Sequence, residues 1–535
     1  MNNVKRPWNR QQARQPTARV VRKVVNTGYS EHGANTSKGS MKTWNPMPSS
    51  PSADIGGSLS IMHARSRDLY MGNTLANSAV KTARTNVIGA GLKVRPRIDR
   101  MILGLSPGEA QAWERYTAKE FDLWAKNKGC DLYKQNNLYD LQDIAYLGQL
   151  LNGDAFALIK YRQPTKLNPY HLRIQLIEAD LVSNPDCYCY TSSDYNVINT
   201  NPSNGNKIVN GVEINSDGAV VAYWICNRYM YDPTNIVESA KWQRVEAYNL
   251  ETDLPNIMQI CHLERPGQYR GIPELAPVID SLKQIGRYTD AELTTAVIRS
   301  FFSLFFTQNK EASAVIGGFP IEGNYEHEKR ETLDPKFLEL GPGTMNTLPQ
   351  GYDVKSMGSN VNASNYDIFV THLLKQVGAS LEIPYEVLIK SFNASYSASR
   401  AALLQAWTAF KTRRQWFVRD FCQPIYEIWL AEAIALGRIK APGYFEEPLK
   451  QAAWSNSLWY GPVMGVLDPV KEIQAAKLRI STGLSTREKE SLEMTGTEYE
   501  ENFEQLAREN DQARALGLKF SGEEMNDSEV LENQE

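Results

Sequence analysis

The sequence predicts an α+β protein in which a mixed N-terminal half precedes a mainly helical C-terminal half. Between residues 155 and 260, short apolar runs are separated by Asn, Asp, Gly and Pro, which is typical of strands and turns. From residue 273 onward, apolar residues recur every three or four positions over long stretches, which is typical of amphipathic helices. With 535 residues the chain is long enough for several packed subdomains.

The composition is that of an ordinary globular protein. Hydrophobic residues make up 42% of the chain and charged residues 22%, so the chain can bury a core. The net charge is −3 and the pI is about 6.2, which gives no overall sign of tight nucleic-acid binding. The most apolar stretch, 296–306, includes Arg299 and is far shorter than the ~20 residues of a membrane span. We therefore expect no membrane-spanning segment.

Charge is concentrated at the two ends. Residues 1–23 contain seven basic residues and no acidic one, and a linker rich in Gly, Ser and Pro follows over roughly 33–57. Residues 498–535 contain twelve acidic and three basic residues. We interpret 1–58 as a basic arm with its linker and 496–535 as an acidic tail. Both could be solvated ends, or the arm could contact DNA or a neighbouring subunit.

Two helices are expected before the first strands. Residues 60–86 carry spaced apolar residues among Arg and Lys, and the pattern stops at Gly89-Ala-Gly91. A second helix should run from the capping residue Ser106, followed by Pro107, to about Lys126. Its aromatic residues, which we interpret as core, are Trp113, Tyr116, Phe121 and Trp124.

Strands are expected in the region that follows. The runs 155–161, 172–177 and 219–225 are rich in β-branched, aromatic and other apolar residues. Asn210-Gly211 and Asp217-Gly218 are dipeptides typical of hairpin turns. The N-terminal half is therefore predicted to contain hairpins as well as helices.

The C-terminal half begins with a candidate helix of 34 residues over Pro273–Phe306, which would be about 50 Å long. Its apolar positions recur at helical spacing, and Lys283 and Arg287 lie on the opposite face. Between 307 and 357 the pattern breaks into Gly- and Pro-rich turns with short extended runs. One such run is 352–355.

Three more helices and one loop follow. A helix over 365–381 should stop before Ile383-Pro384, and a polar loop should cover 390–399. A long helix over 398–436 should be kinked or broken near Pro424. The last helix, 469–480, starts at Asp468-Pro469, a capping residue followed by Pro. Two long helices around a small insertion predict an elongated hairpin with a knob at its tip.

No motif for catalysis, cofactors or metals is evident. Gly33–Ser40 has the residue types of a phosphate-binding loop in the wrong order, and no hydrolase or metalloprotease motif is present. Cys187-Tyr-Cys189 lacks a second pair of ligands. Cys261 and His262 are adjacent, and neighbouring residues of a strand point to opposite faces. We therefore expect no enzyme, no cofactor and no metal.

Eleven short stretches between about residues 60 and 500 follow one another in a specific order. They are Ala64–Tyr70, Asn86–Leu92, Glu178–Asp180, Arg270–Glu274, Leu340–Thr344, Leu348–Gly351, Leu381–Leu388, Asn393–Leu404, Cys422–Tyr426, Asp468–Glu472 and Gly483–Arg487. In this order the set resembles the lambda-type family of tailed-bacteriophage portal proteins.

The resemblance implies an elongated subunit that assembles into a ring, usually of twelve copies, at one vertex of the capsid. It implies a wing over 59–270, stem helices over 271–306 and 358–388, a small α/β clip over 307–357, a tunnel loop over 389–399, and wing or crown helices over 400–495.

The resemblance also implies partners. These are double-stranded DNA, the terminase large subunit, the major capsid and scaffold proteins, and head-completion proteins. The protein would be assembled in the host cytoplasm and would remain at the portal vertex of the virion. The implied DNA-facing residues are Lys283, Arg287, Lys390, Ser391, Asn393, Ser395 and Arg400. The implied docking residues of the clip are Glu322, Glu328, Lys336, Met345 and Lys355.

The charge of the chain is compatible with a channel through which DNA slides. DNA that must slide should meet few fixed cations, because each neutralised phosphate adds affinity. Twelve chains of charge −3 give a ring with a total charge of about −36, which would repel DNA rather than bind it tightly.

Other interpretations remain open. Lys283 and Arg287 could pair with acids on neighbouring helices and not contact DNA. The chain could also be another ring-forming connector or capsid protein, or an enzyme acting on DNA, although the latter needs clustered acids or a phosphate loop.

Overall fold

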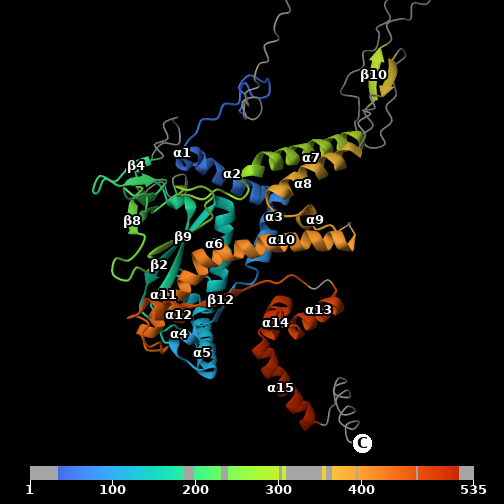
Figure 1. Cartoon of the computed structure of the whole chain (residues 1–535). Coiled ribbons are helices and arrows are strands. Elements are labelled where there is room, and N and C mark those ends of the chain that lie inside the picture. The colour runs from blue at the N-terminus through green and yellow to red at the C-terminus, as the bar shows by residue number, and fades with distance from the viewer. Residues whose placement is uncertain are drawn as a thin grey trace, which may run out of the picture. The chain divides into compact units, whose positions relative to one another are not determined.

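The computed structural model (Figure 1) describes residues 34–185, 198–229, 239–300, 304–308, 352–356, 364–392, 395–465 and 468–516. The chain divides into two units, residues 1–50 and 51–535. In the first unit, the described residues 34–50 form turns. For example, the Asn35 side chain accepts hydrogen bonds from the backbone N–H groups of Ser37 and Lys38.

The N-terminal part of the second unit is helical. One helix was predicted over 60–86, and this prediction is wrong, because the chain forms two helices that meet at Asn73. The Asn73 side chain accepts hydrogen bonds from the N–H groups of Leu75 and Ala76 and so caps the second helix. The helices are α1 (Pro51–Gly56), α2 (Leu59–Gly72), α3 (Thr74–Val87), α4 (Arg100–Leu103), α5 (Pro107–Ala125) and α6 (Leu138–Asn152).

The helix predicted from Ser106 is confirmed as α5. Ser106 and Glu109 form a reciprocal capping box at its start. Phe121 and Trp124 are fully buried, as expected for core aromatics, whereas Tyr116 is 53% exposed and is not part of the core.

The predicted strands are confirmed, and every described pairing between strands is antiparallel. A three-stranded sheet has the order β3-β2-β9, and a five-stranded sheet has the order β4-β5-β6-β7-β8. Asn210-Gly211 turns between β5 and β6 with positive φ at both residues. These strands are β2 (Asp154–Tyr161), β3 (Leu172–Glu178), β4 (Ile198–Thr200), β5 (Lys207–Val209), β6 (Val212–Ile214), β7 (Val220–Cys226), β8 (Trp242–Glu246) and β9 (Ile257–Cys261).

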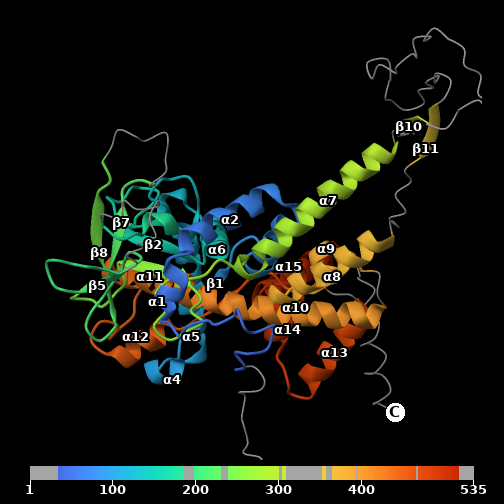
Figure 2. The same ribbon diagram turned by 90° about the horizontal axis from the view of Figure 1, so that it is seen from above.

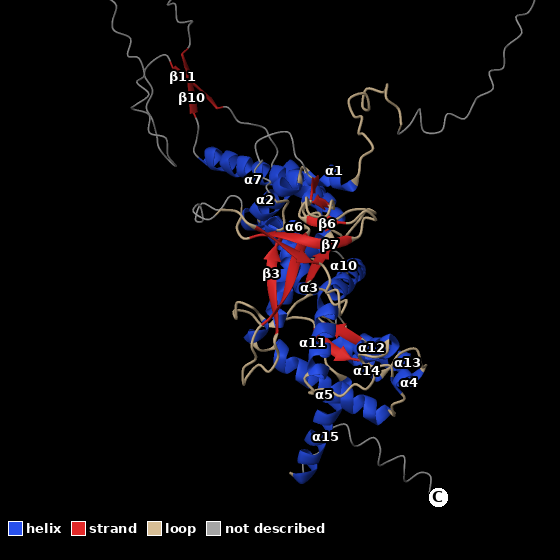
Figure 3. Cartoon of the chain, turned by 90° about the vertical axis from the view of Figure 1, so that its left-hand side faces the viewer, coloured by secondary structure: helices blue, strands red, loops and turns tan. Residues whose placement is uncertain are grey.

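Both faces of β2 are buried, which explains its continuous apolar run. Ala155 and Ala157 point into a large core shared with the helices, including α6. Phe156 and Leu158 point into a smaller core shared with the five-stranded sheet. The strand therefore joins the two cores, and Figure 3 shows these sheets beside α6.

The predicted helix over Pro273–Phe306 is too long at both ends. Ala276–Val278 is a 3₁₀ turn, and α7 covers Ile279–Ser300. Leu304–Gln308 is strand β10, which pairs with β11 (Tyr352–Ser356), so β11 confirms the extended run predicted at 352–355.

The second long helix is confirmed as α8 (Ser364–Ser380), followed by the short α9 (Tyr385–Ile389). Near Pro424, where a kink or break was expected, the helix is irregular but is not broken. α10 (Tyr396–Phe417) continues as a π-helical turn over Val418–Cys422 into α11 (Gln423–Ala435), and Pro424 lies in the first turn of α11.

In its described residues, the C-terminal region adds four helices and a strand, β12, that pairs with the early strand β1. The remaining elements are β1 (Lys93–Pro96), α12 (Pro448–Ser455), β12 (Ser457–Tyr460), α13 (Pro469–Ser481), α14 (Arg487–Thr495) and α15 (Tyr499–Ala515). β1 pairs with β12, which is more than 350 residues later in the chain. The side chain of Asp468 caps α13 as predicted. Among the described residues, no helix has the length and apolarity that a membrane span requires.

Candidate functional site

Helices α7 and α8 run side by side (Figures 1 and 2). Where they join the rest of the chain, Leu282 and Ile285 are buried. Further along, the ring of Tyr288 packs against the ring of Phe369 edge to face, with centroids 5.4 Å apart. The hydroxyls of Thr289 and Tyr366 are 2.9 Å apart. One face of α7 therefore packs against α8, and the opposite face of α7 points away from α8.

The opposite face of α7 carries the two predicted cations. Lys283 and Arg287 are one helical turn apart and both are exposed. Neither forms an ion pair with a carboxylate in the described parts of the chain. The alternative that they pair with acids on neighbouring helices of the same chain therefore finds no support in the described region.

The connection between α9 and α10 contains the predicted polar loop, but the loop is shorter than predicted. Lys390 ends α9 in the left-handed conformation, with φ of 56°, and its side chain is exposed. The side chain of Ser395 accepts a hydrogen bond from the N–H of Ala398 and caps α10. Residues 396–399 therefore belong to the helix. Ser391 is half-buried, and Asn393 lies outside the described residues.

Arg400 has a partner that the sequence did not reveal. Its Nη1 lies 3.0 Å from Oε1 of Glu472 in α13. A neighbouring carboxylate partly neutralises this guanidinium, so Arg400 differs from Lys283 and Lys390 as a candidate for contact with phosphate.

Of the five predicted docking residues of the insertion, only Lys355 lies among the described residues. Glu322, Glu328, Lys336 and Met345 lie outside the described residues. Lys355 lies in β11, where its backbone is opposite Phe305 of β10. The β10–β11 ladder joins the two ends of the insertion.

Several of the stretches that carried the resemblance form buried polar junctions. The first junction involves Arg270, which begins the stretch Arg270–Glu274. Its side chain is 4% exposed and forms an ion pair with the fully buried Asp154, and the distance from Nε to Oδ2 is 2.6 Å. Arg270 also donates to the backbone carbonyls of Ala179, Val182 and Asn210. One side chain thus ties together β2, the residues after β3, and the hairpin of the five-stranded sheet.

A second junction fixes the base of α7 and α8. Arg413 of α10 donates to Glu274 at 2.6 Å and to the carbonyl of Leu381 at 3.1 Å. The next residue, Arg414, donates to the carbonyls of Asn86 and Val87 at the end of α3. Burial lowers the pKa of Arg414 to about 10, so it remains charged at neutral pH.

A third junction links α2 to the stretch Glu178–Asp180. Asp180 accepts from Nδ1 of His63 at 2.6 Å and pairs with Arg67, which also donates to Glu178 at 2.9 Å. Burial favours the neutral acid, but these two donors outweigh it and hold the pKa of Asp180 at about 2. The sequence reasoning missed all three junctions. The only available signal was that one side of each junction, such as Arg270, Glu274 or Asp180, lies within the quoted stretches.

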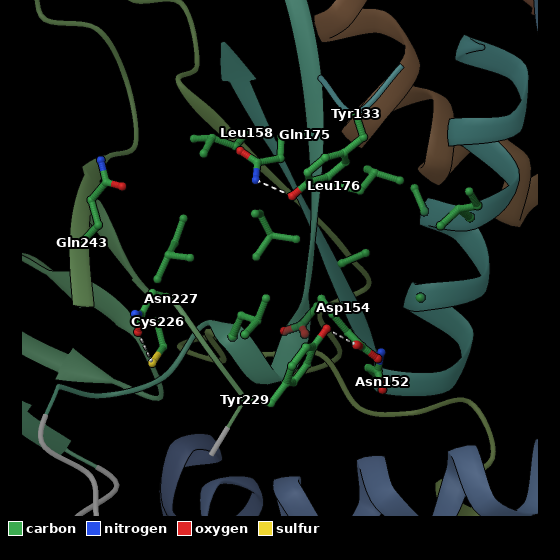
Figure 4. Close-up of a pocket in the computed structure, with 18 of the residues that line it drawn as sticks. Tyr133, Asn152, Asp154, Leu158, Gln175, Leu176, Cys226, Asn227, Tyr229 and Gln243 are labelled. Carbon is green, nitrogen blue, oxygen red and sulfur yellow. Dashed lines mark hydrogen bonds between the residues drawn. The ribbon is translucent and has the colours of Figure 1, made fainter. Parts of the chain in front are cut away.

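A cavity of about 820 Å³ lies between α6, β2, β3, β7 and β8 (Figure 4). Much of its lining is apolar, for example Leu158 and Leu176. At one end, Nε2 of Gln175 donates to the hydroxyl of Tyr133 at 2.7 Å. Its two carboxylates are already paired, Asp154 with Arg270 and Glu178 with Arg67. The cavity therefore offers a hydrophobic surface but no set of reactive groups.

No metal-binding group is found in the part of the chain that the structure describes. Cys261 is buried, and its neighbour His262 stacks on the ring of Trp416 with centroids 3.8 Å apart, so the two side chains do not converge. Cys187 and Cys189 lie outside the described residues.

Comparison with known families gives one extensive match. Residues 37–414 match the model of the family described as phage portal protein, lambda family. Portal protein B of Escherichia phage lambda is 24% identical over 509 residues, which cover 92% of this chain and 91% of that protein. The portal protein of Escherichia phage N15 is 23% identical over 505 residues, which cover 90% of this chain and 89% of that protein.

Among solved structures, two from gene transfer agent particles are similar in part. A chain from the virion of the native particle is 12% identical and covers 80% of this chain and 91% of its own, with a TM-score of 0.39. A chain from the neck of the native particle, computed with C12 symmetry, is also 12% identical, with coverage of 81% and 92% and a TM-score of 0.39. A TM-score of 0.39 does not establish a shared overall arrangement.

Proposed function

Because the chain belongs to the lambda family of phage portal proteins, we propose that it forms a ring of identical subunits at one capsid vertex, through which double-stranded DNA enters and leaves. The match over residues 37–414 carries this proposal, since it runs from before α1 to within α10. We expect twelve subunits. The proposal includes no enzymatic activity and no cofactor.

The parts of the subunit follow from the family. We propose that the sheets with α1–α6 form the wing, α7 and α8 the stem, and residues 307–357 the clip. The tunnel loop would be the segment between Lys390 and Ser395, and the later helices would form the wing and crown. The pairing of β10 with β11 supports this division, because it brings the two ends of the insertion together beyond the stem helices.

The channel wall would carry few free cations. We propose that Lys283, Arg287 and Lys390 face the DNA, because all three are exposed. Repeated around a ring they would form separate positive belts that hold the duplex through its phosphates, without reading its sequence. Ser391, Asn393 and Ser395 would add polar contacts. We expect Arg400 to contribute less, because Glu472 already pairs with it.

The remaining partners would bind away from the channel. We propose that the clip docks the terminase large subunit during packaging and head-completion proteins afterwards, through Glu322, Glu328, Lys336, Met345 and Lys355. Capsid and scaffold proteins would surround the ring, which would be assembled in the host cytoplasm and kept in the virion.

Negative-stain electron microscopy of the purified full-length protein tests the proposal. We expect rings with a central hole wide enough for a duplex. A compact monomer under every condition of salt and concentration would contradict the proposal. An ATPase and nuclease assay with added Mg²⁺ should show no activity, and clear activity would instead support the alternative of an enzyme acting on DNA.

A further inference from the structure

Three arginines form a basic strip on the β1–β12 sheet and α5. Arg95 lies in β1 and Arg97 directly follows the strand, and both side chains reach the same carboxylate, that of Glu488. Arg115 comes from α5. The Arg95 side chain is only 10% exposed, and the other two are about half exposed. We call Arg95, Arg97 and Arg115 the basic strip.

Three glutamates of α14 and α15 lie on the basic strip, and we call them the acidic cover. Glu488 is 2.8 Å from Arg95 and 2.6 Å from Arg97. Glu500 is 3.7 Å from Arg95 and 4.0 Å from Arg115. Glu504, one turn after Glu500, is 2.7 Å from Arg115. Three positive groups thus face three glutamates of the cover, and Glu114 of α5 is a further carboxylate close to Arg95 and Arg97.

The acidic cover makes few apolar contacts with the rest of the protein. Among the described residues, neither hydrophobic core includes a side chain of α13, α14 or α15. In α15, Phe503 and Leu506 are 60% and 55% exposed. A partly exposed ion pair contributes only ~0–1 kcal/mol and is screened by salt. Apart from a hydrogen bond from the Tyr460 hydroxyl to Glu498 at the start of α15, the cover is therefore held mainly by contacts that another anion can replace.

We propose that α14 and α15 form a detachable acidic cover on a DNA-backbone site, and that DNA phosphates replace the carboxylates of Glu488, Glu500 and Glu504 on the basic strip. Guanidinium groups bind phosphate and carboxylate through the same planar two-point geometry, so the exchange conserves the kind of contact. This inference rests on the proposed function, because DNA is the polyanion that the ring would enclose. The site would accept any duplex sequence, since it contacts only the backbone.

Binding of a short fluorescent DNA duplex to the full-length protein, measured by anisotropy at several salt concentrations, tests the inference. In the variant Glu488→Gln/Glu500→Gln/Glu504→Gln the strip is uncovered, and we expect about tenfold tighter binding, because the competing ion pairs are removed. In the uncovered variant, removal of Arg97 and Arg115 should lower the slope of log K against log salt by about 1.8, because each arginine–phosphate contact contributes about 0.9.

A charge-matched control separates this effect from a general loss of negative charge. Glu493→Gln/Glu509→Gln/Asp511→Asn removes three acids at exposed positions of the same two helices that do not contact the strip. We expect this control to bind DNA as the wild type does, apart from a small change due to net charge. Equal tightening in both variants would overturn the inference.

Two further measurements complete the test. Adding Arg97→Gln and Arg115→Gln, which leave the buried Arg95 in place, to the uncovered variant should reverse the gain in affinity, and an unchanged affinity would overturn the inference. In the wild type, DNA should accelerate amide hydrogen exchange in α14 and α15. If rings form but these effects are missing, this inference alone fails. If no rings form, the proposed function fails whatever the DNA affinity.

Discussion

Arg270 and Asp154 form a doubly hydrogen-bonded ion pair inside the protein. Nε of Arg270 donates to Oδ2 of Asp154 at 2.6 Å, and Nη2 donates to Oδ1 at 3.1 Å. With both side chains removed from solvent, the remaining donors of the guanidinium bind backbone carbonyls, so every charge in the junction has partners. The pair fixes the point where the sheets meet the segment leading to α7.

Removal of Arg270 should strongly destabilise the protein. Arg270→Met would leave the Asp154 carboxylate buried and unpaired, which typically costs about 3–5 kcal/mol. The matched control is Arg265→Met, which breaks the half-exposed pair between Arg265 and Asp54 and should cost under about 1 kcal/mol. Urea unfolding followed by circular dichroism measures both. Equal losses of unfolding free energy in the two variants would show that burial of the ion pair does not determine its contribution to stability.

The glycine after Arg270 should tolerate no side chain. A Cβ on Gly271 would lie 1.9 Å from the carbonyl oxygen of Gly153, which is a backbone atom and cannot easily move. We expect Gly271→Ala to cost at least about 1–3 kcal/mol through overpacking. Gly108→Ala in α5, where a Cβ would meet nothing within 4 Å, should be neutral or slightly stabilising. Thermal melting of the two variants compares them directly.

Glu213 should make the five-stranded sheet sensitive to acid. Its side chain is fully buried, which favours the neutral acid. Hydrogen bonds from Arg244, Asn204, Asn206 and Trp224 outweigh burial and lower its pKa from the ordinary 4.5 to about 2. Because the folded pKa is below the unfolded one, the stabilisation is complete above about pH 4.5 and is lost as pH falls toward 2.

The variant Glu213→Gln tests this pH dependence. It should be less stable than the wild type at pH 7, but its stability should fall less between pH 4.5 and 2, because it has no carboxylate to protonate. Glu246→Gln, on the same sheet but half exposed, should follow the wild-type profile. Urea midpoints at a series of pH values provide the comparison, and parallel profiles for Glu213→Gln and wild type would refute the prediction.

Lys390 should affect DNA packaging through its charge. Its backbone is left-handed, so alanine would add strain to the loss of charge, whereas asparagine tolerates this conformation. We expect Lys390→Asn to reduce the yield of DNA-filled particles severalfold and Lys390→Arg to retain it. Lys166→Gln, at an exposed loop position, is the charge control. Normal packaging and retention of DNA with Lys390→Asn would remove Lys390 from the proposed channel wall.

Local signals were sufficient for many elements. The capping residues Ser106 and Asp468, each followed by Pro, start α5 and α13 as predicted. The Asn210-Gly211 dipeptide forms its hairpin turn because few other residue pairs adopt positive φ twice. These features depend on neighbours within a few residues, and such neighbours are visible in the sequence.

Local signals failed where distant contacts decided the structure. Residues 60–86 have a helical pattern throughout, yet Asn73 divides them. Its cap on α3 is a local contact that the apolar pattern concealed, and its bond to the carbonyl of Leu282 in α7 is a distant one. The run 301–306 extends the apolar pattern of α7, but the backbone of Phe305 pairs with that of Lys355 in a strand. Short apolar runs fit either helix or strand, and pairing across the insertion selects the strand.

By itself, the sequence determined the α+β class, most helix and strand positions, the resemblance to portal proteins and the identity of the candidate cations. Only the tertiary structure decided which charges are free and which are paired. Arg400 meets Glu472, Arg270 meets Asp154 and Arg95 meets Glu488 across separations of 72, 116 and 393 residues. The free energy of an ion pair depends on distance and burial in space, and neither quantity is contained in the spacing of residues along a chain.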